Sequence, residues 1–95
     1  MEFEWDEAKS DACLGRRGFD FAFASRVFDD PARLVERDLR IDYHEARYVA
    51  IGRIDSRVFV VVYTPRHDRL RLISPRKANP REVRRYGDGP RDPNG

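Results

Sequence analysis

The sequence has few of the residues that build metal centres, disulfides and nucleophilic active sites. Its one cysteine, Cys13, has no partner for a disulfide within the chain, which is typical of a reducing compartment. The two histidines, His44 and His67, lie 23 residues apart and outside any ligand motif, so we expect no bound metal and no other cofactor. The six glycines are scattered and form no phosphate-binding loop. These shortages argue against a metalloenzyme, a thiol enzyme and an enzyme with a glycine-rich phosphate loop.

Long hydrophobic runs are missing as well. The longest apolar stretch, from Val58 to Tyr63, is far too short to cross a bilayer, and the acidic N-terminus does not look like a secretory signal. We therefore expect a soluble, cytoplasmic protein with no membrane partner. With 95 residues there is room for one domain, expected over residues 1–86. Residues 87–95 are Gly, Pro, Asp, Arg and Asn, and we expect a disordered tail there.

Charge is unevenly distributed along the chain. Residues 1–45 contain seven Lys or Arg and twelve Asp or Glu, a net charge of −5. Residues 46–95 contain twelve basic and five acidic residues, a net charge of +7. Such a basic half attracts phosphates or an acidic protein partner, although a solvated basic surface without function has the same composition.

The pattern of apolar, capping and turn residues predicts an α+β domain. A short strand is expected at residues 3–5, a helix from the N-cap Asp6 to about Arg17, and a second short helix from the cap Asp20 to residues 29–31. Strands are expected at 34–38, 47–54, 57–64 and 69–74, a loop at 42–45, and a last helix from Pro80 to about Tyr86. The predicted fold is an antiparallel sheet with two N-terminal helices on one face and a short C-terminal helix, and the strand at 57–64, apolar on both faces, is expected at its centre.

Polar side chains at the predicted strand ends could cleave RNA without a metal. Such cleavage needs a base for the 2′-OH proton, cations for the phosphorane and an acid for the leaving oxygen. Glu45 or His44 is the candidate base, and Arg71 and Arg76 are candidate phosphate ligands. Alternation along the last strand places Arg69 and Arg71 on one face.

The alternative for these charged residues is a set of ordinary surface ion pairs. Arg47 with Glu45, and Arg85 with Glu82, are pairs of this kind, and exposed pairs contribute little to stability. Alternation along the strand predicted at residues 69–74 places Ser74 on the face opposite to Arg71.

Six segments, in one order along the chain, carry a family resemblance. They are Phe3-Glu4-Trp5-Asp6 with Lys9, Arg26-Val27-Phe28-Asp29-Asp30-Pro31, Glu45-x-Arg47-Tyr48-x-x-Ile51-Gly52, Val60-Val61-Val62-Tyr63-Thr64, the stretch from Arg69 to Ala78, and Arg81-Glu82-x-x-x-Tyr86. Together they cover nearly the whole body of the chain, and they resemble the BrnT family of toxins.

The resemblance implies a fold related to RelE-type ribonucleases and a toxin that cleaves RNA and arrests translation. It also implies a BrnA-like antitoxin with a ribbon-helix-helix domain, through which the complex would contact operator DNA indirectly. In the leading hypothesis Glu45 or His44 is the base, Arg71 and Arg76 stabilise the transition state, and Arg47 orients the site. RNA-binding roles are expected for Lys9, Arg16, Arg17, Arg69 and Lys77.

Several positions depart from the family pattern. Cys13 stands where the family has Asn, Arg16-Arg17 stand where it has Lys-His, and Pro75 replaces Ala, which predicts a strand end or an edge at that point. Arg17 cannot shuttle protons near neutral pH. This departure motivates an alternative function, a catalytically weakened binding partner in an antitoxin-containing repressor complex. Direct DNA binding by the basic half is a third hypothesis, without a helix-turn-helix pattern in its favour.

Overall fold

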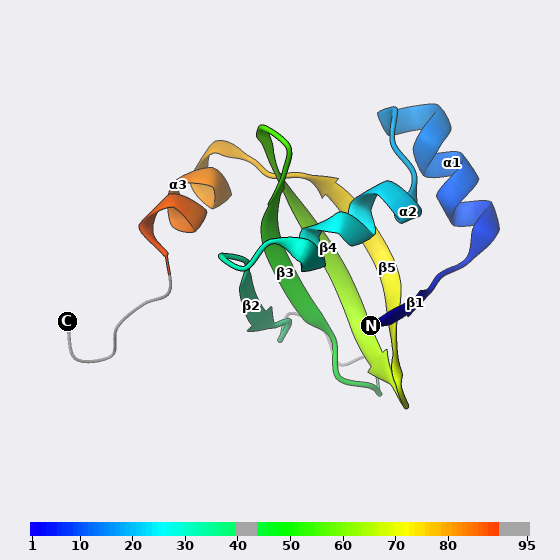
Figure 1. Cartoon of the computed structure of the whole chain (residues 1–95). Coiled ribbons are helices and arrows are strands. Elements are labelled where there is room, and N and C mark those ends of the chain that lie inside the picture. The colour runs from blue at the N-terminus through cyan, green and yellow to red at the C-terminus, as the bar shows by residue number, and fades with distance from the viewer. Residues whose placement is uncertain (40–43, 90–95) are drawn as a thin grey trace.

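Five strands form one sheet in the computed structural model, which describes residues 1–39 and 44–89 (Figure 1). The strands are β1 (Glu2–Glu4), β2 (Leu34–Arg37), β3 (Tyr48–Ile54), β4 (Arg57–Arg66) and β5 (Arg69–Lys77), in the spatial order β1-β5-β4-β3-β2. The helical elements are α1 (Glu7–Arg17), α2 (Phe21–Ala24), the 3-10 helix η1 (Ser25–Asp29) and α3 (Pro80–Asp88). The α+β class and the central place of β4 confirm the prediction. Residues 42 and 43 of the predicted loop at 42–45, and residues 90–95 of the predicted tail, lie outside the described residues.

The sheet is mixed, and the prediction of a wholly antiparallel sheet is wrong. Strands β2 to β5 are joined by antiparallel pairing, but β1 lies parallel to β5, with Phe3 opposite Leu70. Helices α1, α2 and η1 take the chain from β1 to the far edge of the sheet, where β2 lies. The chain then reverses direction between β2 and β3, between β3 and β4, and between β4 and β5, so β5 runs parallel to β1. Parallel pairing needs such a long connection, and residue alternation within a strand does not reveal it.

Strand β5 contains a bulge that changes which side chains share a face. Val62 pairs with Ser74 and Tyr63 with Leu72, so Ile73 is an extra residue on β5. The predicted alternation across this point is therefore wrong, because the bulge moves Ser74 onto the face of Arg71. The strand also continues through Pro75 to Lys77. Proline is tolerated here because no described residue of β1 pairs with β5 beyond Arg71, which leaves an edge.

Capping residues close in sequence set the ends of the helices. The Asp6 carboxylate accepts from the backbone N–H of Lys9, and Asp20 accepts from that of Phe23. Gly18 ends α1 with a φ of 82°, a left-handed conformation that glycine adopts without strain. Helix α2 continues into η1 rather than remaining α-helical to its end, and α3 runs to Asp88, two residues beyond its predicted end.

One face of the sheet packs against α2 and η1, which cross it in Figure 1. Gly52 on β3 allows η1 to approach closely, because a Cβ at this position would lie 2.9 Å from Val27 Cγ1. The buried core on this face includes Cys13, Phe19, Phe21, Ala24, Val27, Ala50, Ile54, Phe59, Val61, Tyr63 and Leu72.

The opposite face is covered at one end by α3, over a smaller cluster of Leu34, Ile51, Val58, Val60 and Ala78 that Tyr86 joins. Polar contacts fix this helix, because none of its own residues is fully buried. The Tyr86 hydroxyl donates to Asp30, which also accepts from the backbone N–H of Arg53 at 2.8 Å. In the described residues, no helix has both the length and the apolar character that a membrane span requires.

Candidate functional site

Three hollows adjoin at the β5 bulge, and Ile73 lines each of them. The charged hollow, of about 110 Å³, is lined by Asp6, Lys9, Glu45, Arg47, Arg66, Arg71, Leu72 and Ile73. The cationic hollow, of about 290 Å³, is lined by Lys9, Ala12, Cys13, Arg16, Arg17, Phe21, Ile73, Ser74 and Pro75. The sheet groove, of about 810 Å³, is lined by Glu36, Arg37, Asp38, Leu39, Arg47, Val49, Ile51, Val60, Val62, Ile73, Ser74, Arg76, Glu82 and Arg85.

The charged hollow brings together four residues that the sequence singles out. Lys9 comes from α1, Glu45 and Arg47 from the segment before β3, and Arg71 from β5. A guanidinium nitrogen of Arg47 lies 3.7 Å from the Glu45 carboxylate, so the predicted ion pair is present. On the other side, Arg71 lies 3.7 Å from Glu4 of the parallel strand β1. Two carboxylates, Asp6 and Glu45, thus share the hollow with four cationic side chains.

Sequence reasoning missed Arg66 as a member of this site. Its guanidinium lies 3.3 Å from Glu45 and therefore shares that carboxylate with Arg47. Because Pro65 is typical of the start of a turn, the sequence pattern assigns Arg66 to the turn, whereas β4 continues through both residues. In the structure Arg66 pairs with Arg69, and His67 and Asp68 form a two-residue hairpin connection. Assigning that short connection from the sequence would have placed Arg66 at the end of the strand.

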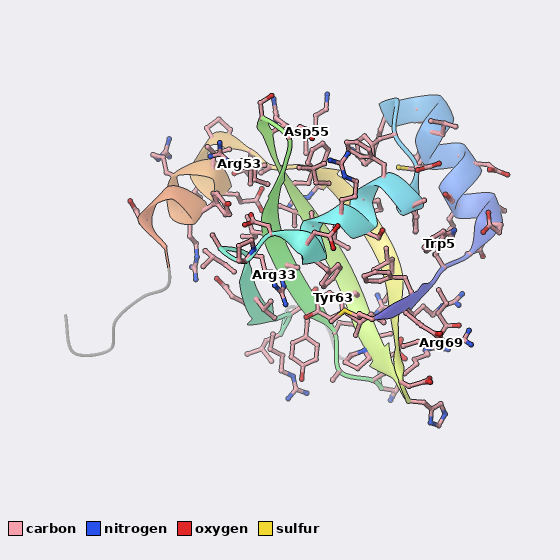
Figure 2. The ribbon with its side chains drawn as sticks, in the orientation of Figure 1. Trp5, Arg33, Arg53, Asp55, Tyr63 and Arg69 are labelled. Atoms are coloured by element: carbon pink, nitrogen blue, oxygen red, sulfur yellow. The ribbon has the colours of Figure 1, made fainter. Side chains whose placement is uncertain are left out.

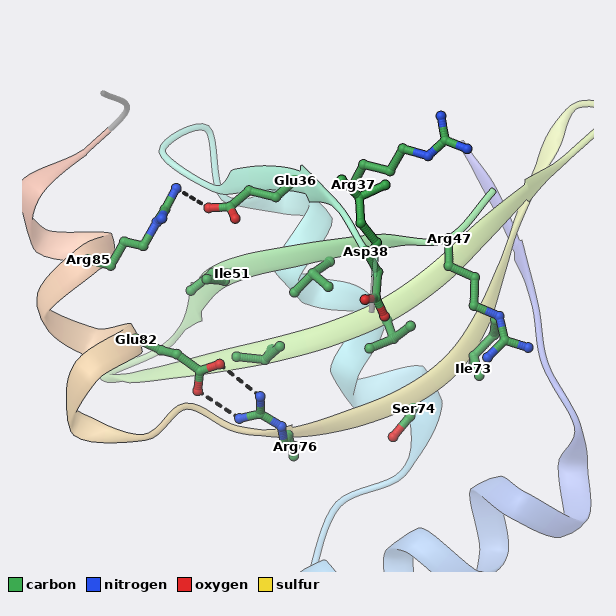
Figure 3. A pocket seen from close by; sticks show the side chains of 14 residues that line it. Glu36, Arg37, Asp38, Arg47, Ile51, Ile73, Ser74, Arg76, Glu82 and Arg85 are labelled. Atoms are coloured by element: carbon green, nitrogen blue, oxygen red, sulfur yellow. Dashed lines mark hydrogen bonds and ion pairs between the residues drawn. The ribbon is translucent and has the colours of Figure 1, made fainter. Parts of the chain in front are cut away.

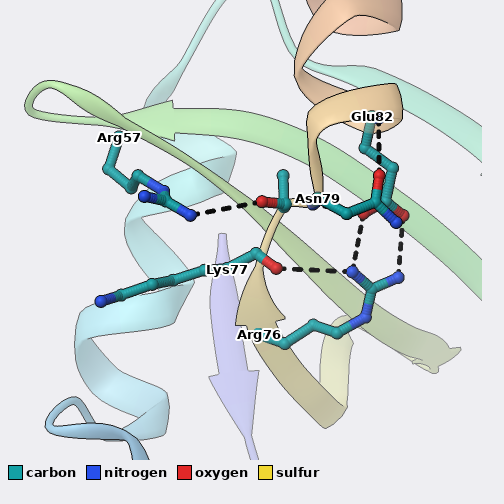
Figure 4. Close-up of polar contacts among 6 residues, drawn as sticks. Arg57, Arg76, Lys77, Asn79 and Glu82 are labelled. Carbon is teal, nitrogen blue, oxygen red and sulfur yellow. Dashed lines mark hydrogen bonds and ion pairs between the residues drawn. The ribbon is translucent and has the colours of Figure 1, made fainter.

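His44 and Arg76 do not line the charged hollow. His44 is exposed, has a positive φ of 61° and is not among the residues that line the hollow. Arg76 lines the sheet groove, where its guanidinium donates two hydrogen bonds to Glu82, at 2.7 and 2.8 Å (Figure 4). This bidentate contact lowers the pKa of Glu82 against the opposing effect of its burial. The predicted pair of Glu82 with Arg85 is wrong, because Arg85 contacts Glu36.

The cationic hollow contains three of the residues predicted to bind RNA. Lys9, Arg16 and Arg17 line it, and none of the described residues that line it is acidic. Cys13 lies at its base with only 3% of its surface exposed, and burial raises the pKa of the thiol. A thiol held protonated in this way is a poor nucleophile, so the chemical feature that this hollow presents is the positive charge of its lining.

Arg69 and Lys77 stand at the two ends of β5 and line none of the three hollows. Arg69 lies 3.3 Å from Glu2, toward the end of the sheet opposite the Asp55 turn (Figure 2). Lys77 is exposed and points away from the contact between Arg76 and Glu82 (Figure 4).

Comparison with known protein families is informative over most of the chain. The family model described as "Ribonuclease toxin, BrnT, of type II toxin-antitoxin system" matches residues 5–82, a range that includes every residue of the charged and cationic hollows. No curated protein matches the chain. Membership of such a family implies an RNA target and an antitoxin partner. The chain belongs to the BrnT family, the ribonuclease toxins of type II toxin–antitoxin systems.

Proposed function

We propose that the chain is a metal-independent endoribonuclease that cleaves RNA at the charged hollow and thereby arrests translation. The observation that carries this proposal is the convergence of Lys9, Glu45, Arg47 and Arg71 on one hollow from three separate parts of the chain. Guanidinium groups supply there the positive charge that a metal ion supplies in other nucleases.

In the proposed reaction, the Glu45 carboxylate takes the proton from a ribose 2′-OH. The 2′ oxygen then attacks the adjacent phosphorus, the bond from phosphorus to the 5′ oxygen breaks, and a 2′,3′-cyclic phosphate remains. Arg47 and Arg71, with Arg66 beside them, stabilise the negative charge of the phosphorane. Lys9 is the ammonium group in the hollow and donates the proton to the leaving 5′ oxygen. His44, exposed beside Glu45, is the alternative base.

The neighbouring phosphates of the RNA are proposed to lie in the cationic hollow. Lys9, Arg16 and Arg17 would hold them there, since these side chains line a hollow whose described lining contains no carboxylate. Arg76 already donates to Glu82 and lines the sheet groove rather than the charged hollow, so we assign it a secondary role. Arg69 and Lys77 would extend the basic surface along β5.

The finer details of the system are also proposals. Family membership supports a RelE-like fold, a BrnA-like antitoxin that neutralises the toxin in the cytoplasm, and contact with operator DNA only through that antitoxin. The weakened binding partner remains the alternative function that the experiment below separates from an active toxin.

The test uses Glu45→Gln and Arg71→Ala in the full chain, with Arg84→Ala on the exposed side of α3 as the control. Loss of a general base is expected to reduce the cleavage rate by about 10²–10⁴-fold, and loss of a charge-stabilising donor by about 10²–10³-fold. Rates are measured on a single-stranded RNA in EDTA, and growth is followed after induction of each variant. The control is expected to cleave RNA and arrest growth like the wild type.

Wild-type cleavage by folded Glu45→Gln would exclude Glu45 as the base. Normal growth after induction of the soluble wild-type chain would favour the weakened binding partner, and Arg17→His would then be the first variant to assay for restored cleavage.

A further inference from the structure

The bulged residue Ile73 has no partner on β4, because Leu72 and Ser74 on either side of it pair with the consecutive residues Tyr63 and Val62. Its side chain is partly exposed, whereas Leu72 is only 2% exposed. In Figure 3 it lies on β5, on the far side of Ser74 from α3. A bulge interrupts the regular ladder and turns a side chain in a new direction, and bulges are frequent next to active sites. Here the residue added by the bulge is apolar and accessible.

Ile73 also marks the boundary between the two hollows that we assign to RNA. Among the described residues, Lys9 and Ile73 are the two that line both the charged hollow and the cationic hollow. An RNA strand with phosphates in both hollows therefore crosses this boundary. One of the two residues is an ammonium group and the other is apolar. A nucleotide has matching parts, since it joins a charged phosphate to a base with an apolar face.

In the described linings of these two hollows, Ile73 is the one accessible apolar side chain larger than alanine. Ala12 is exposed but has a single methyl group. The other apolar residues of the two linings are buried: Cys13, Phe21, Leu72 and Pro75. The rest of the lining is charged or carries a hydroxyl, and contacts of such groups with phosphates position a strand without recognising its bases. Ile73 is thus the place where a base can bury apolar surface.

The proposed reaction decides which nucleotide crosses the boundary. Lys9 protonates the 5′ oxygen that leaves, so the nucleotide that carries this oxygen lies against Lys9. Its own 3′ phosphate then continues toward Arg16 and Arg17 in the cationic hollow. The nucleotide on the 3′ side of the cleaved bond is therefore the one that Ile73 meets.

We propose that Ile73 is a substrate-binding residue, whose side chain contacts the base on the 3′ side of the cleaved bond in a single-stranded RNA. The side of the bond rests on the proposed function. The base has to be unpaired, because an apolar contact of this kind reaches a base that is free of its neighbours in a helix. The contact neutralises no phosphate, so it adds the same affinity at every salt concentration.

The test compares the full-length wild type with Ile73→Ala on one labelled single-stranded RNA whose cleaved bond has been mapped. Ile73→Ala is expected to raise both Kd and KM by about 3- to 10-fold and to leave kcat within about two-fold of wild type. The slope of log affinity against log salt is expected to stay that of the wild type. Urea denaturation verifies that the variant is folded.

Two further variants control for changes in the fold. Val62 is apolar and partly exposed, and it lines the sheet groove but neither of the hollows assigned to RNA. Val62→Ala is therefore expected to change Kd and KM by less than about two-fold. Ile73→Val keeps a branched apolar side chain and is expected to retain most of the wild-type affinity.

RNAs with one abasic position locate the contact. An abasic position directly 3′ of the cleaved bond is expected to bring the Kd of Ile73→Ala to within about two-fold of the wild-type Kd, because the partner of the side chain is gone. An abasic position directly 5′ of the bond is expected to preserve the difference. An equal loss of affinity on both abasic RNAs would assign Ile73 a structural role and overturn the inference, as would wild-type affinity of Ile73→Ala for the intact RNA.

Binding data separate this inference from the proposed function. If the wild type binds the RNA without cutting it, the proposed function is rejected. A series of RNAs with one abasic position each then tests the contact by binding alone, and the inference expects one position at which wild type and Ile73→Ala become equal. A wild-type chain with no higher affinity for intact RNA than for abasic RNA would overturn the inference whether or not the chain cleaves.

Discussion

Gly52 shows how one small residue fixes the distance between the sheet and the helical layer. A Cβ at this position would lie 2.9 Å from Val27 Cγ1 and 3.0 Å from the Val27 carbonyl oxygen, and Val27 is completely buried. The Val27 side chain has no exposed surface into which it could shift, so an added methyl group would have to push η1 away from the sheet.

Gly52→Ala is therefore expected to lower the free energy of unfolding by about 1–3 kcal/mol. Gly15→Ala is the matched control, since a Cβ at Gly15 within α1 would project into open space, and the change should raise helix stability by up to about 1 kcal/mol. Urea denaturation of the two variants measures both effects. Equal stability of the two variants would contradict the assigned role of Gly52.

Glu82 and Asp30 are two residues whose ionisation makes the stability of the fold depend on pH. The hydrogen bonds from Arg76 lower the pKa of Glu82 below its ordinary value of 4.5. Burial opposes ionisation of Asp30, but hydrogen bonds from Tyr86 and two backbone N–H groups outweigh it and lower its pKa as well. A lowered pKa in the folded state gives stability that is present above the unfolded-state pKa and is lost as pH falls through the folded-state value.

Wild-type stability is thus expected to fall between about pH 5 and pH 3, and the fall should be smaller in Glu82→Gln. Glutamine retains the capping hydrogen bond to Asn79 but loses the charge, so we expect a loss of about 1–2 kcal/mol at pH 7 that shrinks in acid. Denaturation at several pH values measures this, with Asp68→Asn at an exposed turn as the control. Parallel pH curves for wild type and Glu82→Gln would rule out this linkage.

Elements whose signals are local can be predicted from the sequence. Asp6, Asp20 and Asn79 each cap the helix that the sequence pattern predicts after them, because a cap depends on residues within one turn. The parallel pairing of β1 with β5 could not be predicted, since it joins segments more than 60 residues apart and leaves no pattern in either one.

In the candidate site, too, contacts between residues close in the sequence are predictable and contacts made by the fold are not. Glu45 and Arg47 are close in the sequence, and their spacing is enough to predict the ion pair that they form. The binding of Arg76 by Glu82 depends on how α3 folds back over the end of β5, which no spacing rule contains. Arg66 escapes prediction because proline is typical of a strand end. In the structure β4 continues through Pro65, beyond Tyr63, where its pairing with β3 stops.

At the scale of the whole molecule, the basic half of the sequence is not one uniform surface. Much of its charge is used in ion pairs within the fold, as in Arg66 with Glu45 and Arg69 with Glu2. The cationic hollow, without acidic residues in its described lining, is where positive charge is most available to a polyanion. Affinity for RNA should therefore depend on salt through a small number of side chains.

Arg16→Gln combined with Arg17→Gln is expected to reduce the slope of log affinity against log salt by about 1.4, at about 0.7 for each phosphate of a single strand that is no longer neutralised. Arg81→Gln combined with Arg84→Gln removes the same charge from the exposed surface of α3 and should leave the slope nearly unchanged. Titrations of a labelled single-stranded RNA at several salt concentrations give both slopes. An equal change in the two double variants would mean that RNA responds to net charge alone.

The extra residue in β5 has a consequence for reading related sequences. Arg71 and Arg76 are separated by an odd number of positions, and in a regular strand such residues point to opposite sides. They face the same side here only because Ile73 adds one step. A sequence alignment that ignores this extra residue can match identical amino acids whose side chains point to opposite faces of the sheet. Relatives with an even spacing between these two arginines are expected to have a strand without the bulge, so the parity of the interval is itself a structural marker.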